Sequence, residues 1–121
     1  MTIRVLAVDD SRTIRDLLSH ALTGAGYQVT LAEDGQDALD RLAAAAPDAI
    51  ISDINMPRLD GFGLIQAVRQ IDRYRATPIL VLTTESAPEL KARARAAGAT
   101  GWIVKPFAAD KLVRALHMIA G

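Results

Sequence analysis

The chain has 121 residues, with fourteen basic and fourteen acidic side chains and no cysteine. A chain of this length suits one domain, so we expect a single unit over residues 1–121. The lack of cysteine excludes a disulfide framework and a thiolate metal site, and the balanced charge argues against long-range attraction to nucleic acid or membranes. No apolar run reaches the roughly 18 residues of a membrane span, so we expect a cytoplasmic protein without membrane insertion or a nucleic-acid partner.

The first half of the chain alternates between strand and helix patterns. Ile3–Val8 is rich in β-formers and predicts a strand, and Ser11 can cap a helix over Arg12–Thr23. Gly24 and Gly26 end that helix. Three further elements follow in order: a strand over Tyr27–Ala32, a helix over Asp34–Ala46 that Pro47 stops, and a buried strand over Ala49–Ser52.

The second half repeats the alternation. A loop over Ile54–Asp60 leads into a helix over Gly61–Ile71, and Pro78 precedes a strand over Ile79–Leu82. The remaining elements are a helix that Ser86 caps, with Pro88 in its first turn and Gly98 at its end, a strand over Trp102–Val104, and a helix over Ala108–Ala120. Five apolar strands alternating with five helices predict an α/β fold: a doubly wound, five-stranded parallel sheet with helices on both faces.

Four of the predicted strands end at a polar residue. Asp9 and Asp10 follow the first strand, Asp53 the third, Thr83 the fourth and Lys105 the fifth. The carboxyl ends of parallel strands share one edge of the sheet, and ligands of open α/β sheets bind outside that edge. We therefore expect three carboxylates, a hydroxyl and an ammonium group to converge there.

This set of side chains predicts a divalent-cation and phosphoryl site. Adjacent carboxylates repel one another unless a cation intervenes, and an all-oxygen set without His or Cys favours Mg²⁺ or Mn²⁺. Asp53 is the best candidate nucleophile, because aspartyl carboxylates accept phosphoryl groups. Lys105 can hold a phosphoryl oxygen as a point charge.

Four motifs then carry a family resemblance: VDDS at residues 8–11, SDINMPRLDG at 52–61, VLTTE at 81–85 and WIVKPF at 102–107. In this order and spacing they resemble the receiver domains of two-component response regulators, over the whole chain. The resemblance implies a flavodoxin-like, CheY-like sheet with the strand order 2-1-3-4-5.

The resemblance also implies roles for the site residues. Asp53 would accept a phosphoryl group from a phosphohistidine of a histidine kinase. Asp9, Asp10, Asp53 and the backbone carbonyl of Asn55 would bind the metal ion, with Asp9 acting mainly through water. Lys105 would bind the phosphoryl oxygens. The peptide bond between Lys105 and Pro106 would be cis.

Further residues would read the modification or set its lifetime. Thr83 would be the switch hydroxyl, with Trp102 at the aromatic switch position, where the family usually has tyrosine or phenylalanine. An ordinary core aromatic is the alternative for Trp102. Asn55 and Glu85 occupy positions that tune phosphoryl hydrolysis in this family, although a solvated loop explains two polar residues equally well.

The expected function is that of a stand-alone receiver without an output domain, which assists its own phosphorylation and dephosphorylation but is otherwise not an enzyme. We expect a monomer that signals by phosphorylation-dependent protein binding in chemotaxis, with a chemotaxis-type kinase as donor and the flagellar motor switch as a partner that controls flagellar rotation. Partner contacts are expected on one face of the fourth helix, fifth strand and fifth helix, at Lys91, Arg95, Trp102, Lys111 and Arg114.

Several alternatives remain open from the sequence. Motor-binding members usually carry lysines early in the fourth helix, where this chain has Ala87 and Pro88, so a phosphate sink or a regulator unrelated to motility is the main alternative. An aspartyl-phosphate phosphatase would need a second acid where Asn55 stands, together with an inserted cap. An FMN carrier would need a hydroxyl-rich loop where Asp9 and Asp10 would repel the phosphate.

Overall fold

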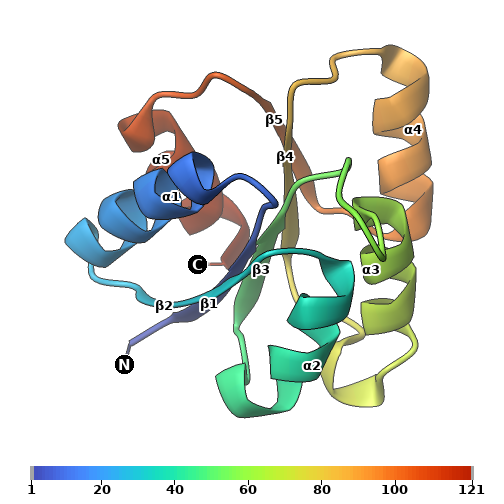
Figure 1. The fold of residues 1–121 in the computed structure, drawn as a ribbon, viewed down its shortest axis with the longest axis horizontal. Helices are drawn as coiled ribbons and strands as arrows, with labels where there is room; N and C mark the ends of the chain where they lie inside the picture. The colour runs from blue at the N-terminus through green and yellow to red at the C-terminus, as the bar shows by residue number, and fades with distance from the viewer. Residues whose placement is uncertain (1, 121) are drawn as a thin grey trace.

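A computed structural model describes residues 2–120 as a five-stranded parallel sheet with helices on both faces (Figure 1). The strand order is β2-β1-β3-β4-β5, as the resemblance implied. The strands are β1 Arg4–Val8, β2 Gln28–Ala32, β3 Ala49–Ser52, β4 Ile79–Thr83 and β5 Gly101–Val104. The helices are α1 Arg12–Gly24, α2 Gly35–Ala45, α3 Gly61–Arg69, α4 Pro88–Ala97 and α5 Ala109–Ala120, with a short 3-10 helix, η1 Asp72–Tyr74.

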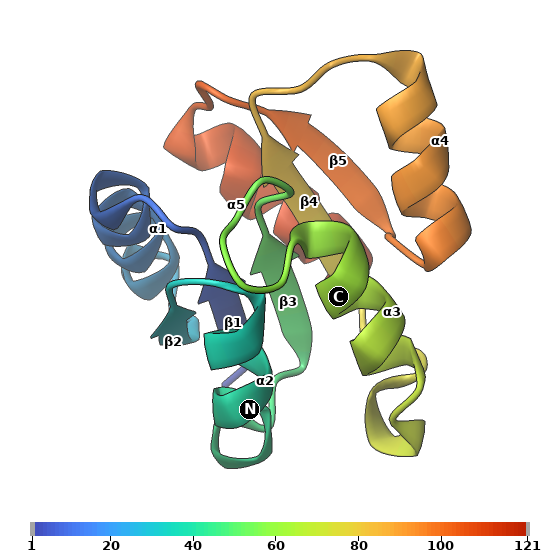
Figure 2. The same cartoon turned by 45° about the vertical axis from the view of Figure 1, so that its right-hand side comes forward.

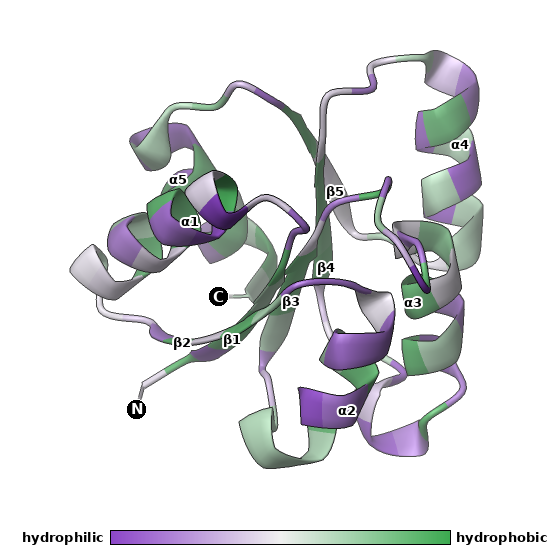
Figure 3. Cartoon of the chain, in the orientation of Figure 1, coloured by the Kyte–Doolittle hydropathy of each residue, from purple (hydrophilic) through white to green (hydrophobic). Residues whose placement is uncertain are grey.

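Two apolar clusters hold the helices onto the sheet. Successive strand side chains point to opposite faces, so Val5 and Ala7 of β1 pack with Leu18 of α1 and Leu112 of α5, whereas Leu6 and Val8 pack with helices α2, α3 and α4. Figure 2 shows α5 behind the sheet and α2 and α3 in front of it, with α1 and α4 at its two sides. In Figure 3 the strands at the centre are mostly green, that is hydrophobic, and the helices carry purple segments. This double cover explains why the strands are continuous apolar runs.

The ends of the elements refine the sequence expectations. Ser11 caps α1 as predicted, with its side chain accepting a hydrogen bond from the Ile14 N–H. The prediction for Ser86 is wrong: α4 begins at Pro88 after Ala87, and no side chain caps it. Asp34 caps α2 from outside the helix, and Thr83 is the last residue of β4.

None of the helices within residues 2–120 is long and apolar enough to cross a membrane.

Candidate phosphoryl and metal site

The polar strand ends meet at one edge of the sheet because the backbone ladder continues past the strands. The Asp9 N–H donates to the Ala32 carbonyl at 3.1 Å, and the Asp53 N–H donates to the Val8 carbonyl at 3.0 Å. On the other side, the Lys105 N–H donates to the Thr83 carbonyl at 2.7 Å. The residues after β1, β3 and β5 are therefore fixed by their neighbouring strands, and their side chains project over the carboxyl edge.

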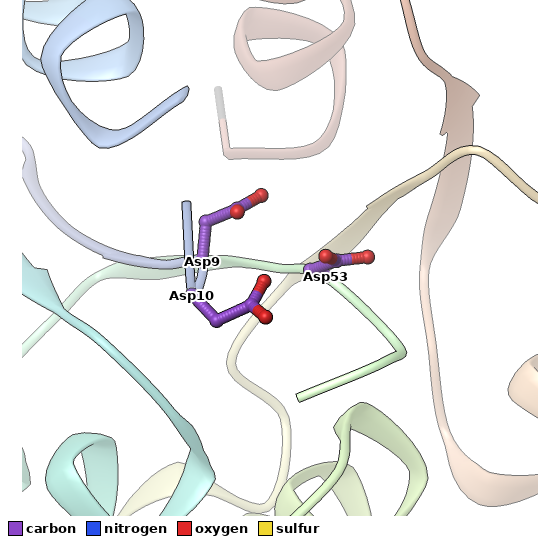
Figure 4. Close-up of side chains that lie close together, drawn as sticks. All are labelled: Asp9, Asp10 and Asp53. Atoms are coloured by element: carbon purple, nitrogen blue, oxygen red, sulfur yellow. The ribbon is translucent and has the colours of Figure 1, made fainter. Parts of the chain in front are cut away.

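Three carboxylates gather at this edge (Figure 4). One oxygen from each of Asp9, Asp10 and Asp53 lies within 4.8 Å of the others. Asp9 and Asp53 are buried, whereas Asp10 is exposed. The expected convergence of the three acids is thus present, with the cluster open to solvent on the side of Asp10.

Lys105 supplies the countercharge. Its Nζ donates to Asp9 Oδ2 at 2.6 Å and to Asp53 Oδ2 at 3.2 Å, and its side chain is 11% exposed. Burial alone would lower the pKa of Lys105, but the hydrogen bond and charge of Asp9, together with Asp53, outweigh burial and raise this pKa above its usual 10.5. The amine is therefore held as an ammonium beside the two buried acids.

Asp9 is the most deeply buried of the three acids. Burial raises the pKa of Asp9 above its usual 3.8, against the opposing effect of Lys105 and of the Ser11 N–H, which donates to Asp9 Oδ1 at 2.9 Å. A buried carboxylate beside two others is stabilised by a further cation. The donor set, oxygens alone with one exposed member, fits Mg²⁺ or a similar hard ion.

The main chain approaches Asp53 closely on its far side. The Ile54 N–H donates to Asp53 Oδ1 at 2.7 Å, and the Gly61 N–H donates to the Ile54 carbonyl at 2.8 Å. A Cβ on Gly61 would lie 2.3 Å from the Asp53 carbonyl oxygen, so only glycine fits there. The sequence expectations did not include this contact, although glycine after the loop was a usable signal.

Thr83 lies at the end of β4, between β3 and β5. Its side chain is fully buried, and Oγ1 accepts a hydrogen bond from the Glu85 N–H at 3.3 Å. Glu85 is half-buried and Asn55 is exposed. The Lys105–Pro106 peptide bond is cis, as the resemblance implied.

Trp102 stands on β5 opposite Val81 of β4. It is partly buried against the cluster formed with α2, α3 and α4, and its Nε1 is buried without a hydrogen-bond partner among the described residues. Together with Lys91 and Arg95 it lines a small hollow of about 50 Å³.

The five expected partner contacts do not form one hollow. Lys111 is an exposed residue of α5, and Arg114 pairs with Asp110 at 3.3 Å. Arg114 instead lines a separate hollow of about 570 Å³ with Ala21 and other residues of α1 and α5, and with Tyr27 of the loop between α1 and β2. The structure therefore brings Lys91, Arg95 and Trp102 together, and places Arg114 on the side of α5 that faces α1.

One ion pair near the site has no counterpart in the sequence expectations. Arg58, in the segment between β3 and α3, donates to both oxygens of Asp34 at 2.8 and 3.0 Å. Asp34 also accepts from the Asp37 N–H at 2.8 Å as the cap of α2. The Arg58 hydrogen bonds are the main reason that the pKa of Asp34 lies below its usual 3.8.

Comparison with known proteins agrees with this geometry. Residues 5–117 match the family described as response regulator receiver domain. The chain belongs to this family. Its members are phosphoacceptor domains that receive phosphoryl groups from histidine kinases and bind Mg²⁺ at an acidic pocket, and the cluster of Asp9, Asp10 and Asp53 supplies such a pocket here.

Solved structures of receivers are similar over the full chain. The chemotaxis protein CheY4 of Vibrio cholerae is 50% identical with a TM-score of 0.95, over 98% of this chain and 99% of that one. The receiver domain of the sensor histidine kinase PA1611 from Pseudomonas aeruginosa is 29% identical with a TM-score of 0.91, over 100% and 99% of the two chains. The latter structure has a magnesium ion coordinated in its active site cleft.

Among curated relatives, the response regulator MprA of Mycolicibacterium vanbaalenii is 39% identical over 119 residues. That match covers 98% of this chain and 51% of the relative. The chain thus spans about half the length of the curated relatives that it matches.

Proposed function

We propose that this receiver takes its phosphoryl group on Asp53. The observation that carries this assignment is the position of the Asp53 carboxylate, which lies within the acid cluster and accepts a hydrogen bond from the Lys105 ammonium at 3.2 Å. Asp9 is fully buried and bonded to Lys105 at the shorter distance of 2.6 Å, whereas Asp10 makes no hydrogen bond or ion pair with a cationic side chain of residues 2–120. Of the three acids, Asp53 is the one whose carboxylate is buried and makes the longer of the two hydrogen bonds to Lys105.

The reaction is a transfer from nitrogen to oxygen. An Asp53 carboxylate oxygen attacks the phosphorus of the donor phosphohistidine, a P–O bond forms, the P–N bond breaks, and the histidine ring leaves with the electron pair and takes up a proton. The product is an acyl phosphate on Asp53. Lys105 would neutralise part of the charge that gathers on the transferring oxygens.

A divalent cation would be held by Asp9, Asp10, Asp53 and the Asn55 carbonyl. When bound, the ion supplies charge that offsets repulsion between the anionic carboxylate and the anionic donor. Asp9 and Asp10 would not react themselves. Their role is to hold this positive charge beside Asp53.

Thr83 and Trp102 would transmit the modification. The Thr83 hydroxyl is buried, and among the described residues its oxygen accepts only from the Glu85 N–H, at 3.3 Å. It can give up this contact in exchange for a new bond in which its O–H donates to a phosphoryl oxygen. That exchange would move the β4–α4 segment and change the surroundings of Trp102. A phosphoryl group can favour the active state only through contacts that it makes better there. Asn55 and Glu85 would then set how fast water removes the group.

Transfer from a histidine kinase tests the assignment. Wild-type protein, incubated with a phosphorylated kinase and Mg²⁺, should acquire one phosphoryl group that base and hydroxylamine remove, as expected for an acyl phosphate, and Asp53→Asn should acquire none. Asp10→Asn should be slow rather than inert, because it loses a metal ligand and keeps the acceptor. Stoichiometric labelling of Asp53→Asn would overturn the assignment.

For the output we propose chemotaxis, with binding to a flagellar motor switch protein. The support is the full-length likeness to chemotaxis protein CheY4 at 50% identity, against 39% for MprA over about half of that relative. The face around Lys91, Arg95 and Trp102 is the proposed contact surface. Lys111 would extend it along α5.

Binding of the beryllofluoride form tests this output. We expect the motor switch protein to bind the beryllofluoride form more tightly than the unmodified protein, and Arg95→Ala to weaken that binding. If the motor protein binds neither form while the kinase still transfers its phosphoryl group, a phosphate sink or a regulator unrelated to motility is the better description.

A further inference from the structure

The segment between β3 and α3 contains a backbone conformation that needs an explanation. Arg58 has a φ of 65°, and the Leu59 N–H donates to the Pro57 carbonyl at 2.7 Å. Together these features describe a γ-turn with positive φ, a rare and strained conformation for a residue with a side chain. Such a conformation persists only where surrounding contacts impose it.

The contacts that impose it come from the start of α2. Arg58 donates to both oxygens of Asp34, which is buried and fixed as the cap of α2. Beside this pair, the Gly35 N–H donates to the Leu59 carbonyl at 3.0 Å. A Cβ on Gly35 would lie 2.3 Å from that carbonyl oxygen, so the two segments touch through their backbones. Two consecutive residues of the turn, Arg58 and Leu59, are therefore tied to Asp34 and Gly35, the cap and the first residue of α2.

The same segment is joined to the site at its base. It starts at Ile54, whose N–H donates to the Asp53 carboxylate, and it closes through the hydrogen bond from Gly61 to Ile54. Asn55 lies inside the closed segment and is exposed, and within the part of the chain that the structure describes its side chain makes no hydrogen bond. The position of the Asn55 backbone is thus set by the base at Ile54 and by the turn at Arg58.

The simpler interpretation of Arg58–Asp34 is an ordinary surface ion pair. Such pairs contribute little to the stability of a protein, and no role in metal binding would follow. Three features argue against it: the arginine binds both carboxylate oxygens, the acid is buried, and the pair holds a residue of positive φ. A matched control is the Arg41–Asp37 pair at 2.9 Å, whose residues lie four positions apart on α2. Among the described residues, Arg41 makes no hydrogen bond or ion pair with the β3–α3 segment.

We propose that Arg58, held by Asp34, is a positioning residue that keeps the β3–α3 segment in the shape that completes the Mg²⁺ site. This proposal rests on the proposed function, because it takes the Asn55 carbonyl as a metal ligand. Groups that orient metal ligands commonly change metal affinity by about 10- to 100-fold when removed. The pair therefore tunes cation binding from outside the acid cluster.

The test compares four variants in two measurements on the whole protein. Calorimetric titration with Mg²⁺ alone gives the dissociation constant, and amide hydrogen exchange in metal-free buffer reports the segment over residues 54–60. Arg58→Ala and Asp34→Asn should each raise the dissociation constant about tenfold and speed exchange in the segment. Asn still caps α2, so the second variant removes the charge while keeping the helix start.

Arg58→Gly and Arg41→Ala complete the set. Arg58→Gly removes the pair and also the cost of positive φ. If the pair acts by imposing this backbone conformation, Arg58→Gly should lose less Mg²⁺ affinity than Arg58→Ala, and an equal or greater loss would contradict this mechanism. Arg41→Ala should match wild type in both measurements. Unchanged Mg²⁺ affinity in Arg58→Ala and Asp34→Asn overturns the positioning role, while failure of the wild type to bind Mg²⁺ overturns the proposed metal site itself.

Discussion

Replacing Lys105 by methionine should weaken the fold and strengthen metal binding at the same time. Methionine keeps an unbranched apolar stem and removes the ammonium that lies 2.6 Å from Asp9 and 3.2 Å from Asp53. Two carboxylates at the cluster's limiting separation of 4.8 Å repel by about 3 kcal/mol at an effective dielectric constant near 20, and by about 1 kcal/mol in water. We therefore expect the free energy of unfolding in metal-free buffer to fall by about 1 to 3 kcal/mol.

The same variant should bind Mg²⁺ more tightly, because the ammonium no longer competes for Asp9 and Asp53. A gain of about 1.4 kcal/mol corresponds to a dissociation constant about tenfold lower. Urea unfolding in chelator gives the first quantity and calorimetric titration gives the second, with the exposed Lys111→Met as control. Equal or weaker Mg²⁺ binding by Lys105→Met would refute the view that lysine and metal share these acids.

The pH dependence of this variant follows from Asp9. Burial raises the pKa of Asp9, so its contribution to stability is favourable below the usual value of 3.8 and is lost as the pH rises through the raised value. Without the lysine this pKa rises further. The stability difference between Lys105→Met and wild type should therefore shrink as the pH falls into the range where Asp9 is protonated.

Three further predictions follow from neighbouring contacts. Gly61→Ala should lower the free energy of unfolding, measured by urea unfolding, by about 1 to 3 kcal/mol, because its Cβ would lie 2.3 Å from the Asp53 carbonyl oxygen. Gly63→Ala should lower it by less, because its Cβ would meet only the flexible end of the Leu59 side chain. Equal losses in the two variants would contradict the backbone clash at Gly61. The lowered pKa of Asp34 contributes stability that is fully present above pH 3.8 and is lost as the pH falls through the folded-state pKa. The loss of unfolding free energy in Asp34→Asn, measured by urea unfolding, should therefore be full at neutral pH and vanish in acid. Fluorescence of Trp102, about 10 Å along β5 from Lys105, should change with beryllofluoride plus Mg²⁺, and an equal change with Mg²⁺ alone would count against its role as a reporter of switching.

The parts of the site on neighbouring strands were predictable from the sequence. Apolar strands that end in Asp9, Asp53 and Lys105 must place these residues at one edge once the strands are parallel, and the register of β1 with β3 fixes the first two side by side. No pattern, however, indicated that Lys105 would lie closer to Asp9 than to Asp53. Which of the two distances is shorter depends on how deeply each carboxylate is buried, and the sequence pattern does not indicate that depth.

Contacts between distant loops were not predictable in the same way. The Asp34–Arg58 pair joins residues 24 positions apart, and its arginine adopts a positive φ for which arginine gives no local signal. The prediction that Ser86 caps α4 was wrong because the chain enters that helix one residue later, through Ala87 and Pro88. Local preference identified the proline at the helix start but could not decide between neighbouring residues as the cap.

We propose that Asp53 is the residue that carries the phosphoryl group. Site mapping tests it most directly: the protein is treated with acetyl phosphate and Mg²⁺, the acyl phosphate is reduced with borohydride, and the reduced position is located by peptide mass spectrometry. We predict reduction at Asp53 alone, with none when Mg²⁺ is removed by a chelator. Reduction at Asp9 or Asp10, or labelling that is equally fast without Mg²⁺, would contradict the account.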